Sequence, residues 1–174
     1  MTLSTYSHIF IRIASLIGRY GPVILFFLSL FFLTGKYITH EIYIAGFMIN
    51  VFVNSILKIL IKQKRPNKYK STTLISSLMD SAPESQKEKE KSVHRYGMPS
   101  GHAQTVSFSL AYISLVLNNL YISTVFLVFT VITCIQRVVF TRHYIDQVII
   151  GALVGCIMAY ITYKIKNKII EEKH

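Results

Sequence analysis

The sequence contains three short polar clusters at the ends of long apolar stretches, and their residue types are suited to binding and cleaving phosphate. The first cluster places Lys58, Lys62 and Arg65 at positions i, i+4 and i+7, so the three cations share one helix face. Pro66 disfavours helix at Arg65 and turns the chain there. Such a face is either a snorkelling helix end or a binding site for an anion.

The second cluster, Pro99-Ser100-Gly101-His102, opens an apolar stretch. A Pro-Ser-Gly sequence at a helix start leaves backbone N–H groups and the Ser100 hydroxyl available, which favours an anion at that position. His102 falls in the first helical turn. An imidazole beside a bound anion is a candidate proton donor.

The third cluster contains Arg137 and His143, followed by Asp146 and Gln147. An acceptor three or four residues after His143 lies on the same helix face as the imidazole. It can bind the Nδ1–H group and leave Nε2 free to attack. Both Asp146 and Gln147 meet this description, and the sequence leaves open which of them orients His143.

The stretches between these clusters have the composition of membrane spans. The chain is 52% hydrophobic, and no Asp, Glu, Lys or Arg occurs in residues 22–34, 42–57, 103–136 and 147–163. A bilayer requires roughly 20 apolar residues for each helix that crosses it, and only helices or closed barrels satisfy the backbone there. We therefore predict an all-α, polytopic transmembrane bundle.

The uninterrupted stretch 103–136 determines the topology. As one helix it would be about 50 Å long, far more than a hydrocarbon core of ~30 Å. We predict a break at Asn118-Asn119, giving spans 101–117 and 120–140. With two crossings in this region, all three polar clusters lie at the same membrane face.

The other spans are predicted at 22–39, 41–61 and 147–163, which makes five in total. Residues 5–19 are amphipathic and precede a break at Gly21-Pro22, so they form either an interfacial helix or a sixth span. Residues 67–95 are polar and Lys-rich, and we predict a mobile loop there. The chain, residues 1–174, is predicted to be a single domain.

The three clusters resemble the signature motifs of the type 2 phosphatidic acid phosphatase superfamily, which includes lipid phosphatases and vanadium haloperoxidases. The motif K-x6-R-P is matched by Lys58, Arg65 and Pro66, and the motif P-S-G-H is matched by residues 99–102.

The third motif of that family, S-R-x5-H-x3-D, is matched at Arg137 and His143. Gln136 and Gln147 replace its Ser and Asp. Gln147, together with the segment 96–104 (YGMPSGHAQ), resembles dolichyl diphosphatases more than phosphatidic acid phosphatases.

The resemblance implies that His143 attacks phosphorus and forms a phosphohistidine, with Asp146 or Gln147 orienting it. His102 would protonate the leaving oxygen and then activate water. The equatorial phosphate oxygens would be held by Lys58, Arg65, Ser100, Gly101 and Arg137. Because these groups supply the positive charge, the resemblance implies neither a metal ion nor another cofactor.

We therefore predict a hydrolase of lipid metabolism, an integral membrane phosphatase acting on a lipid-linked diphosphate such as polyprenyl or dolichyl diphosphate. The alternative substrate is phosphatidate or another lipid monophosphate. More remote alternatives are a vanadium-dependent haloperoxidase, usually a large soluble protein, and a lipid-binding relative without activity. The predicted partners are the lipid substrate and membrane lipids, and the oligomeric state is left open.

The net charge of +11 arises from 19 Lys and Arg against 8 Asp and Glu. These basic residues flank apolar spans, so they indicate contacts with the membrane or with an anionic substrate. We predict no binding of nucleic acid. The nine Lys and Arg in residues 62–95 favour a cytoplasmic site by the positive-inside rule. The resemblance instead favours the lumenal or exoplasmic face, and we place the site there. The membrane would be that of the endoplasmic reticulum in a eukaryote and the cell membrane otherwise.

Overall fold

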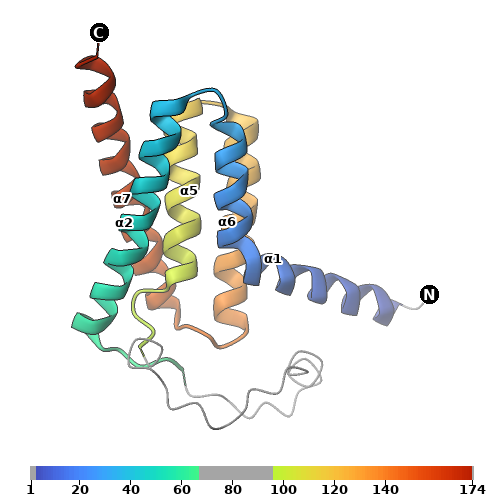
Figure 1. Cartoon of the computed structure of the whole chain (residues 1–174). Coiled ribbons are helices and arrows are strands. Elements are labelled where there is room, and N and C mark those ends of the chain that lie inside the picture. Colours follow the sequence, from blue (N-terminus) through green and yellow to red (C-terminus); the bar gives the residue numbers. More distant parts are fainter. Residues whose placement is uncertain (1–2, 67–95, 174) are drawn as a thin grey trace.

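The protein folds as a bundle of helices in the computed structural model, which describes residues 3–66 and 96–173 (Figure 1). The predicted mobile loop at 67–95 lies outside the described residues. The all-α prediction is confirmed, since the described elements are α1 (Leu3–Phe32), α2 (Tyr37–Ile61), α5 (Gly101–Leu117), α6 (Leu120–Val139) and α7 (Ile145–Glu171).

The predicted break at Asn118-Asn119 is confirmed. Asn118 ends α5 in the left-handed conformation (φ 48°), which Asn tolerates better than most residues. Asn119 then caps α6, because its side-chain oxygen accepts a hydrogen bond from the backbone N–H of Ile122 at 3.1 Å. Two adjacent asparagines thus end one helix and begin the next.

The predictions near the N-terminus are only partly right. Residues 5–19 and the first span form one helix, α1, which contains Pro22. Figure 1 shows that α1 bends, so that its N-terminal part leaves the bundle sideways. The predicted end of the first span at residue 39 is wrong. The chain turns at Gly35 (φ 85°), a conformation that favours glycine, and α2 begins at Tyr37.

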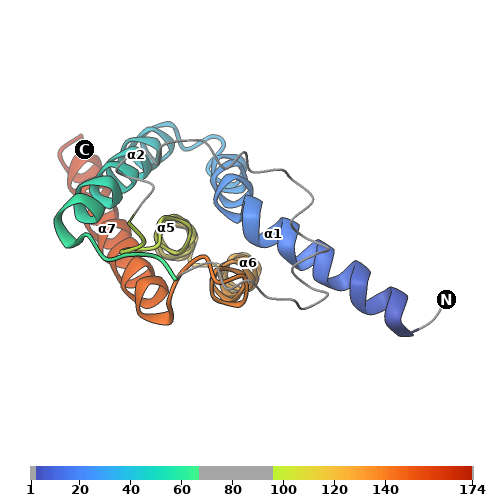
Figure 2. The same cartoon turned by 90° about the horizontal axis from the view of Figure 1, so that it is seen from below.

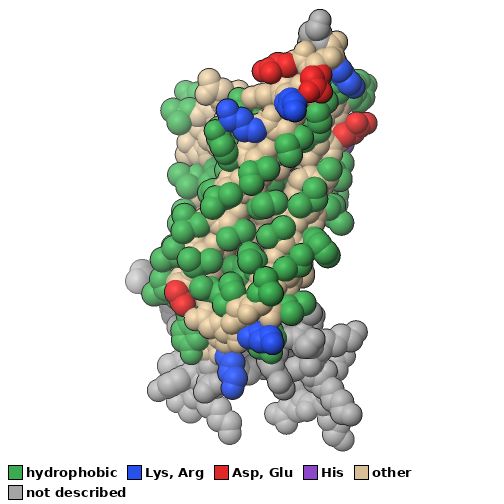
Figure 3. All heavy atoms as spheres, turned by 90° about the vertical axis from the view of Figure 1, so that its left-hand side faces the viewer, with side chains coloured by type: hydrophobic (Ala, Val, Ile, Leu, Met, Phe, Trp, Pro, Cys, Tyr) green, Lys and Arg blue, Asp and Glu red, His purple; other side chains and the backbone are tan. Residues whose placement is uncertain are grey.

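Within residues 3–66 and 96–173, four helices are long and apolar enough to cross a membrane, with α1 counted from Arg12. They expose large apolar side chains such as Phe31, Leu60 and Leu153. Figure 3 shows apolar side chains over the middle of one face and charged side chains near both ends. Helix α5, with 17 residues, lies among the other helices (Figure 2). This is the structure of an integral membrane protein.

Helices α5 and α7 approach each other closely through two glycines. A Cβ atom at Gly151 would lie 2.6 Å from the carbonyl oxygen of Ser100, and one at Gly155 would overlap the carbonyl oxygen of Gln104. The GxxxG spacing of Gly151 and Gly155 therefore serves close packing within the bundle. The contact fixes the start of α5 against the first turns of α7.

The three polar clusters meet at one end of the bundle, as the two-crossing topology predicts (Figure 1). The N–H group of Gly97 donates to the carbonyl of Gln63 at 2.8 Å, which joins the second cluster to the first. The N–H group of Ser100 donates to the carbonyl of Gln147 at 2.9 Å, which joins it to the third.

Candidate active site

His143 lies in the turn between α6 and α7, and only 4% of it is exposed. The backbone N–H groups of Arg142 and His143 both donate to the carbonyl of Arg137, at 3.0 and 3.1 Å. Thr141, two residues before His143, has a positive φ of 50°, which reverses the chain. The turn therefore holds His143 directly beside the end of the helix that carries Arg137.

The hydrogen bonds of Gln147 determine which nitrogen of His143 carries the proton. The Gln147 side-chain nitrogen donates to the carbonyl of Lys64 at 2.9 Å and to Gln63 Oε1 at 3.0 Å. Its oxygen therefore faces His143, and Nδ1 lies 3.0 Å from it. Because that oxygen can only accept, Nδ1 carries the hydrogen and Nε2 keeps its lone pair.

Asp146 has a different partner. Its carboxylate accepts a hydrogen bond from Gln63 Nε2 at 2.9 Å, and its side chain is exposed. Since α7 begins at Ile145, Gln147 occupies its third position, from which a side chain can reach back toward the residues before the helix. Of the two candidates in the sequence, Gln147 is therefore the one that is hydrogen-bonded to His143 in the structure.

The start of α5 provides groups for binding an oxyanion. Ser100 is fully buried, and its hydroxyl has no hydrogen-bond partner among the described residues. A Cβ atom at Gly101 would lie 3.7 Å from Lys58 Nζ and 3.1 Å from Asn54 Oδ1, so both side chains lie close to this helix end. A helix N-terminus, a hydroxyl and an ammonium group together favour a phosphate.

The positive charges of Lys58 and Arg137 are not paired with carboxylates in the part of the chain that the structure describes. The ion pair found there joins Lys168 to Glu172 at 3.9 Å, within the last turns of α7, and no carboxylate pairs with Lys58 or Arg137. Arg137 Nε is buried without a hydrogen-bond partner among these residues. Lys58 and Arg137 are half-buried, and cations withdrawn from water in this way are costly unless an anion binds them, so the arrangement favours an anionic ligand.

Burial lowers the pKa of His143 to about 4, and the positive charges of Arg65, Lys58 and Arg137 act in the same direction. The hydrogen bond with Gln147 opposes this shift. The imidazole is therefore neutral near pH 7, with a lone pair available for attack on phosphorus.

We expect the activity to persist under mildly acidic conditions. An ordinary histidine is half protonated near pH 6.5, whereas the lowered pKa keeps His143 neutral until the pH falls toward about 4. The kcat/KM value, corrected for substrate ionisation measured separately, should show no loss from His143 between about pH 7 and 5. A corrected acid limb near pH 6.5 would contradict this expectation.

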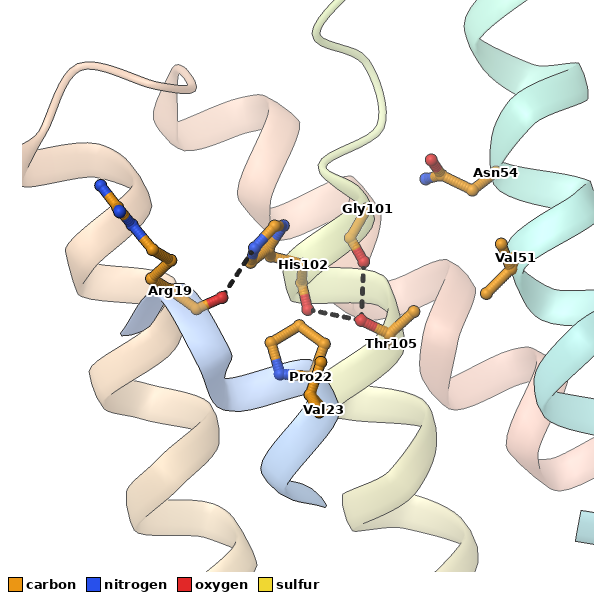
Figure 4. A pocket seen from close by; sticks show the side chains of 8 residues that line it. All are labelled: Arg19, Pro22, Val23, Val51, Asn54, Gly101, His102 and Thr105. Carbon is orange, nitrogen blue, oxygen red and sulfur yellow. Dashed lines mark hydrogen bonds between the residues drawn. The ribbon is translucent and has the colours of Figure 1, made fainter. Parts of the chain in front are cut away.

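His102 lies in the first turn of α5 beside a cavity of about 270 Å³ (Figure 4). Its Nε2 atom donates to the backbone carbonyl of Arg19, at 3.2 Å. This bond occupies Nε2, so Nδ1 is the atom that can exchange a proton with a substrate. The cavity is lined by Arg19, Pro22, Val23, Val51, Asn54, Gly101, His102 and Thr105.

A network of amide side chains beneath the second cluster was not anticipated. Asn54 donates to the carbonyl of Pro99 at 3.2 Å and to Gln104 Oε1 at 2.7 Å. Gln104 in turn donates to the backbone and side-chain oxygens of Asn50, both at 2.8 Å. The sequence does contain a signal, because Asn50 and Asn54 precede Lys58 at intervals of four residues, on the same helix face.

Comparison with known proteins gives two findings. The model of the PAP2 superfamily matches residues 41–171, so the match begins within α2 and does not include α1. A dolichyldiphosphatase of Saccharomyces cerevisiae (strain ATCC 204508 / S288c) is 27% identical over an alignment of 163 residues, which covers 87% of this chain. The match covers 62% of the length of that relative. No solved structure matches.

Proposed function

Because the chain belongs to the PAP2 superfamily, we propose that it is an integral membrane phosphatase that hydrolyses a lipid-linked diphosphate through a phosphohistidine at His143. The observation that carries this proposal is the bond of 3.0 Å between His143 Nδ1 and Gln147. It leaves Nε2 available as a nucleophile beside half-buried cations. We place the site at the lumenal or exoplasmic face of the membrane.

In the proposed reaction, Nε2 of His143 forms a bond to the terminal phosphorus while the bond to the leaving oxygen breaks. The charge on the equatorial oxygens is stabilised by Lys58, Arg65, Arg137, Ser100 and the N–H group of Gly101. For this step His102 must be protonated on both ring nitrogens: Nδ1 gives its proton to the leaving oxygen, and Nε2–H stays bonded to the carbonyl of Arg19. His102 then accepts a proton from the water that cleaves the phosphohistidine, so the enzyme returns to its starting state.

One comparison supports a diphosphate in particular. The similar yeast protein is a dolichyldiphosphatase, and the similarity extends over 87% of this chain.

We expect kcat/KM for a polyprenyl diphosphate to exceed that for phosphatidate by at least ~10-fold, about 1.4 kcal/mol in transition-state stabilisation. The measurement is phosphate release by the purified protein in detergent, from a panel of lipid monophosphates and diphosphates. His102→Ala should impair monoester hydrolysis more, because a phosphate leaving group needs less protonation than an alkoxide. Equal or reversed preference would instead identify a phosphatidate or other lipid monophosphate phosphatase.

A further inference from the structure

Helix α1 contributes two backbone carbonyls to the candidate active site. Arg137 Nη2 donates to the carbonyl of Gly18 at 3.3 Å, and His102 Nε2 donates to the carbonyl of Arg19 at 3.2 Å. Both carbonyls belong to the turn of α1 that precedes Pro22 (Figure 4 shows the bond of Arg19). Two of the proposed site residues are thus bound by consecutive peptide groups of one helix.

Pro22 explains why the first of these carbonyls is available. In a regular helix the carbonyl of Gly18 would accept a hydrogen bond from the N–H group of residue 22. Proline has no N–H group, and its ring also displaces the carbonyl four residues earlier. The carbonyl of Gly18 therefore lacks its helical donor, and Arg137 takes that place.

Two glycines bring this turn close enough to α6 for the contact to form. A Cβ atom at Gly18 would overlap the side chain of Gln136, and one at Gly21 would overlap the side chain of Thr133. Any larger residue at either position would move α1 away from α6. The two glycines and the proline therefore act together. The glycines allow α1 to approach α6, and Pro22 leaves the carbonyl of Gly18 free to accept from Arg137.

The contact orients a group that has few other constraints. Arg137 Nε has no hydrogen-bond partner among the described residues, so the bond from Nη2 to Gly18 is what fixes the direction of the guanidinium. A proline within a membrane helix often has its free carbonyl satisfied by a neighbouring helix without any role in function. Here, however, the donor is the arginine proposed to bind phosphate, and the adjacent carbonyl holds the proposed proton donor.

We propose that the Pro22 bend of α1 is a positioning element of the active site, which holds Arg137 and His102 through the carbonyls of Gly18 and Arg19. The roles of Arg137 and His102 in this inference rest on the proposed function. Helix α1 lies outside the residues matched by the family model, 41–171. Pro22 acts through other residues and is a positioning residue, with no direct contribution to the chemistry.

Pro22→Ala tests this proposal. The substitution restores an N–H group at residue 22, which competes with Arg137 for the carbonyl of Gly18. We expect kcat to fall by ~10-fold or more with KM changed by less than ~3-fold, because misplacing a group that acts in the transition state affects kcat first. The melting temperature should not fall, since alanine is far more favourable than proline within a helix. Tyr20→Ala, a half-exposed neighbour in the same turn, is the matched control and should retain wild-type kcat.

Two further measurements separate positioning from a structural role. The affinity for vanadate, measured by inhibition or direct binding, should weaken about as much as kcat falls. Arg137→Lys should cost less in the Pro22→Ala background than in the wild-type protein, because the two changes disturb the same group. Additive losses would overturn the proposal. Unchanged kcat and vanadate affinity in Pro22→Ala would also overturn it. A raised KM alone would do the same, because it would mean that Pro22 only lines the cavity.

The proposed function and this inference can fail separately. The activity of the wild-type protein on lipid diphosphates tests the first. The ratio of Pro22→Ala to wild type tests the second, and it can be measured with whichever phosphate substrate is best. Vanadate affinity reports on the position of Arg137 even if no substrate is turned over.

Discussion

His143→Ala should reduce kcat by at least ~10⁴-fold, since loss of the attacking nucleophile typically removes nearly all of the chemical catalysis. The remaining cations can still bind the phosphate, so the affinity for vanadate should fall much less than kcat. His40→Ala is the matched control, because His40 lies in the first turn of α2, at the opposite end of the bundle. Phosphate release from the best lipid substrate gives the comparison.

Two further results are expected if His143 is the nucleophile. Rapid acid quenching of the wild-type protein with labelled substrate should trap an acid-labile phosphate on the protein, and His143→Ala should trap none. Hydrolysis should continue in EDTA and be inhibited by vanadate, because Lys58, Arg65 and Arg137 supply the positive charge around the five-coordinate phosphorus. Substantial turnover by His143→Ala, or a requirement for a divalent metal ion, would contradict the mechanism.

The fold could be predicted where the residues that end and begin helices agreed with the maximum length of a membrane span. The stretch 103–136 is too long for one crossing, and Asn118-Asn119 contains both a residue that tolerates positive φ and a good helix cap. Together they determined the number of crossings after the second cluster, and therefore which clusters meet. The end of α1 was harder to predict, because Tyr37 and Ile38, just after Gly35, look like a continuation of the apolar span.

The contacts of the candidate site depend on features that a sequence does not display. Pro22 predicted a disturbance in the helix, but the partner of the freed Gly18 carbonyl depends on how α1 packs against α6. The amides of Asn54 and Gln104 lie in uncharged stretches, which were interpreted as purely apolar. The choice between Asp146 and Gln147 depends on the residue at which α7 begins, and helix ends are the least certain part of any assignment.

Gln147→Ala should lower kcat by ~10²–10³-fold, because it removes the acceptor that keeps the hydrogen of His143 on Nδ1. Without that acceptor, the hydrogen can move to Nε2, and the lone pair then points away from the phosphorus. The substitution also removes the bonds of 2.9 and 3.0 Å that tie α7 to Lys64 and Gln63. KM should change less than kcat, since Gln147 does not contact the substrate in the proposed mechanism.

The neighbouring substitution, Asp146→Ala, is the matched control. Its carboxylate is exposed and binds Gln63, so we expect kcat to fall by less than ~3-fold. Both variants remove one acceptor from the first turn of the same helix, and only one of the two acceptors is bonded to His143 in the structure. A larger loss in Asp146→Ala than in Gln147→Ala would show that the carboxylate orients His143 during turnover. Measuring kcat and KM for both, with melting temperatures to compare their stability, decides between the two residues.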